Sequence, residues 1–196
     1  FQPAEEGPGG AMPMIKAGLL ENPKVDFAFA LHMWNDLPVG QVGVRSGPVM
    51  ASADEWVLTV KGIGGHGAAP HQTVDPVVVA SHIVVALQTI LSRNVDPVKC
   101  AVVTVGQITS GNRFNIIPAE AKLVGTGRAL EEGVRLMVKR RIKEIAENIA
   151  KGLGATAVLD YADGYPPTIN DAKAIYEAGS RIVWPELFAC DSRFAI

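Results

Sequence analysis

The chain has 196 residues, of which 48% are hydrophobic and 19% charged, and its formal net charge is −2 at pH 7. That length suits one large domain or one and a half average domains, and the charge gives no general attraction for nucleic acid or a membrane surface. Two cysteines without a CxxC spacing exclude a disulfide framework and favour a reducing, cytoplasmic setting.

Residues 1–47 are rich in turns but contain three predicted elements. A short helix is expected over Met12–Leu20. The apolar run Val25–Leu31 is typical of a buried parallel strand, which would place His32 at the carboxyl end of that strand. Ligand sites in open α/β sheets gather at such ends. A second strand is expected over Val39–Arg45.

After Ser46-Gly47-Pro48 the composition changes and a new unit begins. We predict strands over 55–61, 101–108, 115–128 and 155–161. Asp75-Pro76 starts a helix that runs to about Arg93, and Glu131-Glu132 start another that ends near Gly152. The order β-α-β-β-α-β predicts a ferredoxin-like two-layer sandwich. One further helix is expected over Asp171–Val183.

These elements predict an α/β protein in which a compact module is inserted into a second domain. Residues 1–47 and 168–196 are assigned to a partial catalytic domain, and residues 48–167 to an α+β insert. Apolar side chains cover most of the circumference of the helix over 75–93, more than one sheet face can bury. We therefore expect a second buried surface there, such as another subunit; packing under the neighbouring domain is the alternative.

Glu5-Glu6 and His32 are the first candidates for chemistry. One carboxylate of an adjacent pair can bind a metal with a histidine while the other stays free as a general base. The alternative is ordinary: most glutamate pairs are solvated, and a histidine near an aromatic residue is often only packed.

The glycine-rich segment from Lys61 to His71 is the most distinctive feature of the module. Gly62, Gly64 and Gly67 match the spacing of a dinucleotide-binding loop. The next helix begins near Asp75, eight residues past Gly67, so its N-terminus is not placed to bind a pyrophosphate and this function is disfavoured. His66 lies between glycines and could donate to a developing oxyanion; alternatively the glycines only serve a tight turn.

Asn115 and Arg128 bracket the strand predicted over 115–128. An arginine suits a bidentate grip on a carboxylate, and an asparagine amide can donate to a carbonyl oxygen. Ordinary polarity at the edge of a sheet is the alternative for both residues.

Together these segments resemble the M20 family of metal-dependent amidohydrolases and peptidases, especially the branch of hippurate hydrolases, N-acyl-amino-acid amidohydrolases and auxin-conjugate hydrolases. The matching stretches are Phe1–Gly10, Gly18–Trp34, Gly47–Asp54, Gly62–Pro76, Arg93–Gly106, Phe114–Arg128 and Gly164–Asp171, in the family's order. The resemblance implies metal-dependent hydrolysis of the amide bond of an N-acyl amino acid or similar conjugate, and a homodimer formed through the inserted lid, or dimerisation, domain.

The resemblance also implies roles for individual residues. Glu5 would be the general base and His66 a catalytic residue presented to the partner's active site. Asn115 and Arg128 would bind the substrate. Glu6 and His32 would be ligands of a pair of divalent ions, Zn, Mn or Co.

The family's other metal ligands are not found in this sequence. The chain is therefore expected to be a piece of a larger enzyme that is inactive alone and not expected to hold the metal pair, because three or more protein ligands are usual. A module that only mediates dimerisation is the alternative function.

Overall fold

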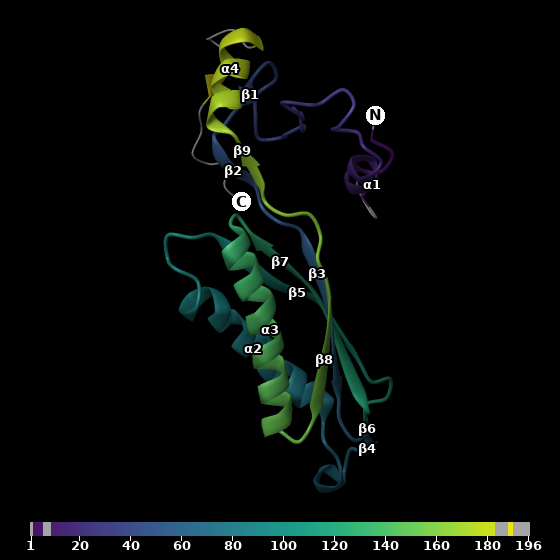
Figure 1. Ribbon diagram of the computed structural model, residues 1–196. Helices are drawn as coiled ribbons and strands as arrows, with labels where there is room; N and C mark the ends of the chain where they lie inside the picture. The colour runs from purple at the N-terminus through teal and green to yellow at the C-terminus, as the bar shows by residue number, and fades with distance from the viewer. Residues whose placement is uncertain (1, 6–8, 183–187, 190–196) are drawn as a thin grey trace. The chain divides into compact units, whose positions relative to one another are not determined.

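The structure is a computed structural model that describes residues 2–5, 9–182 and 188–189. Contacts divide it into two compact units, Phe1–Gln41 and Val42–Ile196. Figure 1 labels the elements, which are α1 (Ala11–Lys16), β1 (Val42–Gly43), β2 (Gly47–Met50), β3 (Asp54–Lys61), β4 (Gly65–His66), α2 (Pro76–Arg93), β5 (Ala101–Ser110), β6 (Ile116–Ile117), β7 (Glu120–Ala129), α3 (Glu132–Gly152), β8 (Thr156–Ala162), β9 (Thr168–Asn170), α4 (Ala172–Ile182) and β10 (Phe188–Ala189).

The prediction of a strand over Val25–Leu31 was wrong. Phe27, Phe29 and Leu31 are 51%, 63% and 82% exposed, and none of residues 25–31 forms a strand. A strand exists through hydrogen bonds to a neighbouring strand, and none of the described strands pairs with this run. His32 therefore does not lie at the end of a strand. The first helix is also shorter than predicted and ends at Lys16.

Two small pairs of strands begin the second unit. The strand predicted over Val39–Arg45 shortens to β1, which pairs in parallel with β10. β2 pairs with β9 in antiparallel orientation, a contact that the sequence did not suggest. This second pair brings together the two segments that lead into and out of the larger sheet that follows.

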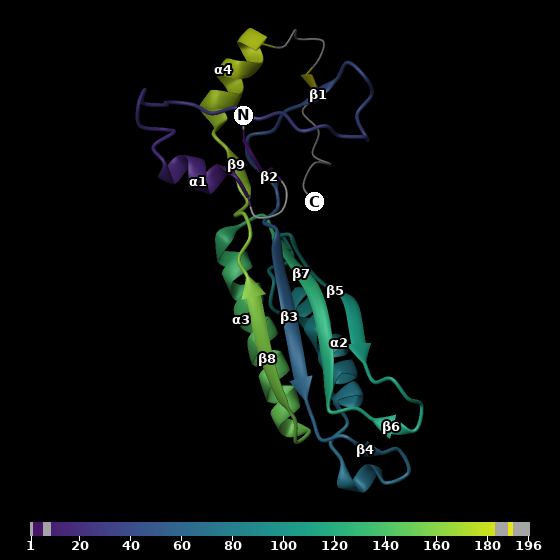
Figure 2. The ribbon, with the colours of Figure 1, turned by 90° about the vertical axis from the view of Figure 1, so that its right-hand side faces the viewer.

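A four-stranded antiparallel sheet with two helices on one face makes up most of the second unit (Figure 2). Its strand order is β5-β7-β3-β8. Together with the chain order β-α-β-β-α-β, this arrangement confirms the predicted ferredoxin-like sandwich. Both helices fell where they were predicted: Asp75 caps α2 by accepting a hydrogen bond from the Val77 amide at 2.8 Å, and α3 starts at Glu132.

The core lies between this sheet and the two helices. In β3 the side chains of Trp56, Leu58 and Val60 are buried, and those between them face the open side of the sheet. This alternation follows from the two-residue period of a strand. The helices supply the opposite layer, with Ile83 of α2 and Ile142 of α3 fully buried.

One predicted strand divides into two. The segment over 115–128 is broken at Pro118 into β6 and β7, because proline has no N–H to donate within a sheet. β6 pairs with β4 as a separate two-stranded ribbon. Figures 1 and 2 place this ribbon at the end of the module far from β2 and β9. We call the β4–β6 end the tip and the opposite end of the four-stranded sheet the linker end.

α2 has the length and hydropathy of a membrane span. Val79, Ile83, Leu87 and Ile90 are nevertheless buried in the core of the sheet. A helix packed in this way is typical of the core of a globular domain.

Gly125 of β7 provides a test of this packing. A Cβ atom there would collide with the Trp56 ring and the Thr104 carbonyl oxygen. We expect Gly125→Ala to lower the free energy of unfolding by about 3 kcal/mol, since overpacking forces neighbouring groups to move. Gly133→Ala is the matched control, because a Cβ there meets no atom within 4 Å and alanine favours a helix. The free energy of unfolding of each variant is measured by urea unfolding followed by circular dichroism. Equal stability of the two variants would contradict this packing.

Candidate functional site

The tip brings two predicted site residues together. In the β4–β6 ribbon His66 lies opposite Ile116, the residue after Asn115. The amide of Gly67 donates to the backbone carbonyl oxygen of Asn115 at 2.8 Å. His66 and Asn115, which are both exposed, therefore lie on neighbouring segments of the tip.

A hydrogen bond sets the tautomer of His66. The backbone amide of Ala68 donates to Nδ1 of the imidazole at 3.1 Å. Because Nδ1 accepts, the proton of the neutral ring is on Nε2. His66 thus presents an N–H donor to solvent, as a group that stabilises an oxyanion must.

The glycines before His66 serve close packing of the backbone. A Cβ on Gly62 would collide with the Val74 carbonyl oxygen, and one on Gly64 would lie 2.9 Å from the Ile117 carbonyl oxygen. These contacts give the spacing Gly62-x-Gly64-x-x-Gly67 a structural cause other than a pyrophosphate site.

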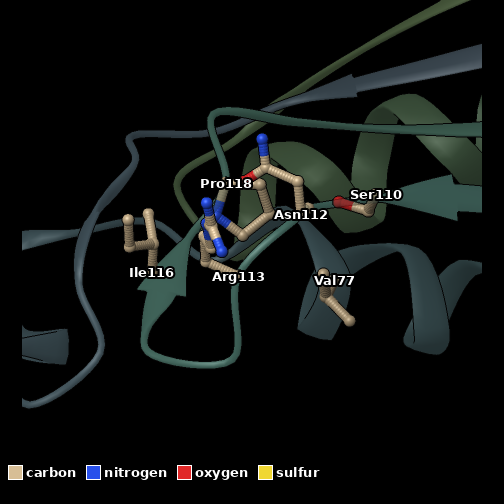
Figure 3. Close-up of a pocket in the computed structure, with 7 residues that line it drawn as sticks. Val77, Ser110, Asn112, Arg113, Ile116 and Pro118 are labelled. Atoms are coloured by element: carbon tan, nitrogen blue, oxygen red, sulfur yellow. The ribbon is translucent and has the colours of Figure 1, made fainter.

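A shallow pocket of about 340 Å³ lies beside the tip (Figure 3). Arg113 and Asn112 line it from the loop before β6, and Val77 lines it from the start of α2. Figure 3 shows the Arg113 and Asn112 side chains beside Pro118. The tip therefore adds an exposed guanidinium two residues before Asn115.

Arg128 lies at the linker end, remote from the tip. It is eight residues along β7 from Glu120, which at a rise of about 3.4 Å per residue is a separation of about 27 Å. Arg128 is exposed on the open face of the sheet, directly opposite Val102 of β5. The structure therefore does not bring Arg128 to His66 and Asn115 within one chain.

A larger cavity adjoins Arg128. It has a volume of about 750 Å³ and is lined mainly by apolar side chains, among them Met50, Leu91, Val95, Val102 and Leu130. Polar atoms in its wall come from Cys100, Thr126, Lys99 and Asp96. No motif or spacing in the sequence indicated this cavity, because its walls come from β2, the end of α2, the loop after α2, and strands β5 and β7.

The metal-site candidates lie in the first unit. The Nδ1 atom of His32 is 2.6 Å from the Met33 carbonyl oxygen, so Nδ1 carries the proton and Nε2 has the free lone pair that a metal requires. Glu5 is exposed, and Glu6 lies outside the described residues. The described part of the chain brings together no group of three or more His, Cys, Asp or Glu side chains that could hold a metal ion. These residues alone therefore do not complete a metal site.

Sequence reasoning missed a buried ionic cluster at the linker end. Asp54 accepts bidentate hydrogen bonds from Nε and Nη2 of Arg135 at 2.8 and 2.7 Å, one from the Gly164 amide at 2.9 Å and one from the Tyr161 hydroxyl at 3.2 Å. The side chains of Asp54 and Arg135 are 1% and 9% exposed. We call Asp54, Arg135, Tyr161 and Gly164 the linker clamp.

The contacts within the clamp shift the pKa values of Asp54 and Tyr161. Burial alone would raise the pKa of Asp54, but the bonds from Arg135, Gly164 and Tyr161 and the guanidinium charge outweigh it, so the pKa lies below its ordinary value of 3.8. Burial and the nearby carboxylate raise the pKa of Tyr161. The Gly164–Asp54 bond of the clamp joins the two connections of the module, and beside it the Ala53 amide donates to the Tyr165 carbonyl oxygen at 3.1 Å.

The sandwich, the tip and the linker end define a module of the kind found in dimeric peptidases. Residues 52–153 match the family of the peptidase dimerisation domain of M20 enzymes. The chain belongs to the M20 family, which confirms the resemblance found in its sequence.

Individual relatives support this assignment. The chain is 45% identical over 170 residues to N-acetyldiaminopimelate deacetylase of Bacillus subtilis, covering 87% of this chain and 46% of the relative. It is 41% identical over 180 residues to thermostable carboxypeptidase 2 of Saccharolobus solfataricus, covering 90% and 45%. The chain thus spans about half the length of the curated relatives it matches.

Solved structures agree with these sequence matches. A chain from methicillin resistant Staphylococcus aureus superposes with a TM-score of 0.88 at 33% identity and covers 96% of this chain and 50% of its own length. The YXEP protein of Bacillus subtilis, described as a dinuclear metal binding peptidase from the M20 family, gives a TM-score of 0.72 at 33% identity and covers 92% and 44%.

Proposed function

We propose that the protein containing this chain hydrolyses the amide bond of N-acyl amino acids with a metal-activated water. In this proposal residues 1–47 and 168–196 belong to the catalytic domain, and residues 48–167 are its lid and dimerisation domain. The observation that carries the proposal is the separation of the candidate residues, with His66 and Asn115 at the tip and Arg128 at the linker end. One small substrate can touch all three only if two chains share a site.

The surface of the module favours such a homodimer. Val77, Val78 and Val85 of α2 are 41%, 51% and 71% exposed. β5, next to α2, is an edge strand of ten residues without a charged side chain, and a long uncharged edge is a template for pairing. α3, on the far side, is rich in charged residues. We propose that a second copy covers α2 and the edge of β5.

A two-fold axis across β5 would complete the active site. Isologous pairing of two β5 edges is antiparallel, so Ala101 of one chain lies near the partner's Ser110. This arrangement carries the partner's tip toward the linker end of the first chain. The partner's His66 and Asn115 could then reach a substrate whose carboxylate is held by Arg128.

The chain's own residues have defined tasks in the hydrolysis. Glu5 removes a proton from the attacking water and later delivers it to the leaving nitrogen. The Nε2–H of His66 and the amide of Asn115 donate to the oxyanion, and Arg128 binds the carboxylate. When bound, a pair of divalent ions polarises the amide carbonyl and lowers the pKa of water. His32 and Glu6 would be two of the ligands of these ions, which we propose are Zn, Mn or Co.

The proposed setting is the reducing cytoplasm. The sequence contains two cysteines and no CxxC pair, too few for the disulfide framework of a small secreted domain.

A second candidate function is a module that only mediates dimerisation. One observation favours it: the family match covers residues 52–153 of the module, a range that contains none of Glu5, Glu6 and His32. The two functions differ in whether the full-length protein turns over an amide.

Glu5→Gln tests the proposed hydrolysis. Glutamine keeps the shape of the side chain but cannot accept the proton of water, so we expect kcat to fall at least about 100-fold. The assay measures release of free amine from N-acetyl amino acids and hippurate by the full-length protein, with metal content determined in parallel. Glu55→Gln, on the open face of the sheet, is the control. A wild-type protein that binds metal but hydrolyses no amide would support the dimerisation module instead.

A further inference from the structure

The cavity at the linker end combines apolar walls with a carboxylate-binding group. Its volume of about 750 Å³ lies in the range of small-molecule sites. Arg128 lines this cavity, and its guanidinium has no ion-pair partner among the described residues. Lys99, the other cation of the wall, is instead paired with Glu131 at 2.7 Å. The free cation therefore lies at the boundary of a mostly apolar space.

The chemistry of an N-acyl amino acid decides which group can fill this space. The carboxylate and the side chain leave the same Cα atom, whereas the acyl group lies beyond the amide nitrogen. When Arg128 holds the carboxylate, the side chain is the nearest group to the cavity. The acyl group extends away from it, toward the scissile bond and the partner's tip.

We infer that this cavity binds the amino-acid side chain of the substrate and selects large apolar side chains. This inference rests on the proposed function, because it takes the carboxylate to be bound by Arg128. Apolar walls disfavour a charged side chain, because they offer no hydrogen bonds or opposite charges to offset the free-energy cost of its desolvation. Met50, Val102 and Leu130 supply such walls around Arg128. The substrate class is therefore N-acyl derivatives of residues such as leucine, methionine and phenylalanine.

Two series of substrates separate the effect of the amino-acid side chain on kcat/KM from the effect of the acyl group. With acetyl constant, we expect kcat/KM of the full-length protein to rise at least about tenfold from N-acetylglycine to N-acetylphenylalanine. N-acetylaspartate should be the poorest of the series. With glycine constant, replacing acetyl by benzoyl should change kcat/KM by a smaller factor. The opposite ranking, with acyl size dominant, would overturn the inference while leaving the proposed hydrolysis intact.

Filling the cavity should remove this selectivity. Val102 lies opposite Arg128 and is 38% exposed, so Val102→Phe places a ring in the cavity. We expect the preference for N-acetylphenylalanine over N-acetylglycine to fall about tenfold. Val158→Phe makes the same change on the open face of β8, where the side chain is 56% exposed and lines neither cavity. An equal preference in both variants would contradict the cavity's role.

Cys100 reports binding without any turnover. Its thiol lines the cavity and is exposed, so its alkylation by N-ethylmaleimide can be followed by peptide mass spectrometry. In the full-length Glu5→Gln variant, N-acetylphenylalanine should slow this reaction several-fold and N-acetylglycine should not. Arg128→Met should abolish the protection. Equal rates with both ligands, or a Cys100 that never reacts because other residues cover it, would refute the inference independently of catalysis.

Discussion

His66→Ala and Arg128→Met are expected to be nearly inactive as separate full-length proteins and to regain activity when their subunits are mixed. Loss of one oxyanion donor typically costs 100- to 1,000-fold in kcat, and we expect about that for His66→Ala. Arg128→Met removes the group that binds the carboxylate, so its KM should rise so far that little turnover remains at substrate concentrations that suffice for the wild type. Metal content should be unchanged in both variants, since neither residue is a proposed metal ligand.

The recovery follows from the length of the four-stranded sheet. Arg128 lies about 27 Å along β7 from Glu120, and His66 lies at the tip, at the Glu120 end of that strand. A heterodimer of the two variants has one site that combines the intact Arg128 of one chain with the partner's intact His66. Random mixing makes half of the dimers heterodimers, each with one intact site of two, so roughly a quarter of the wild-type activity should return.

The mixed sample distinguishes the two arrangements sharply. If each site used His66 and Arg128 of one chain, no dimer in the mixture would contain an intact site. Denaturing and refolding the variants together provides the exchange, and the variants refolded separately provide the control. Light scattering must show dimers throughout; a strict monomer that is fully active would overturn the shared site.

The predictions that succeeded rest on local patterns. Asp75-Pro76 fixes the start of α2 through a cap that needs only neighbouring residues, and the alternation in β3 follows from strand geometry. The strand predicted over 25–31 failed because a strand also needs a partner, which composition cannot supply. The break at Pro118 was visible in the sequence, and the missing N–H of proline explains it.

The candidate site could be predicted only in part. His66 and Asn115 were each proposed, but their contact arises from the pairing of β4 with β6, which no spacing reveals. The partners Asp54 and Arg135 are 81 residues apart and meet only because α3 packs against β7 and β8, the two strands that flank β3. The separation of Arg128 from the tip likewise depends on the structure, because β7 runs from Glu120 near the tip to Arg128 at the linker end.

Asp54→Asn is expected to lower the free energy of unfolding of the chain by about 3 kcal/mol at pH 7. The amide keeps the shape of the carboxylate but removes its charge, which leaves the Arg135 guanidinium buried without its main partner. Breaking a buried pair in this way typically costs about 3–5 kcal/mol. Glu132, at 3.3 Å from Nη1 of Arg135, compensates only in part because its side chain is 52% exposed.

Asp163→Asn is the matched control. Asp163 pairs with Lys139 at 2.6 Å close to the same connection, but the two side chains are 56% and 36% exposed. Exposed pairs contribute at most about 1 kcal/mol, so the same chemical change should have a small effect there. Equal destabilisation by the two variants in urea unfolding at pH 7 would show that the linker clamp adds no stability of its own.

Acid should erase the difference between wild type and Asp54→Asn. The pKa of Asp54 in the folded chain lies below its ordinary value of 3.8, so its contribution to stability is fully present above that pH. The contribution falls as the pH drops through the lower pKa of the folded state, where the carboxyl group becomes protonated. Urea unfolding of both proteins from pH 7 down to about 3 should therefore show wild-type stability falling toward that of the variant. A difference that stays constant over this range would mean that the Asp54 charge does not hold the clamp together.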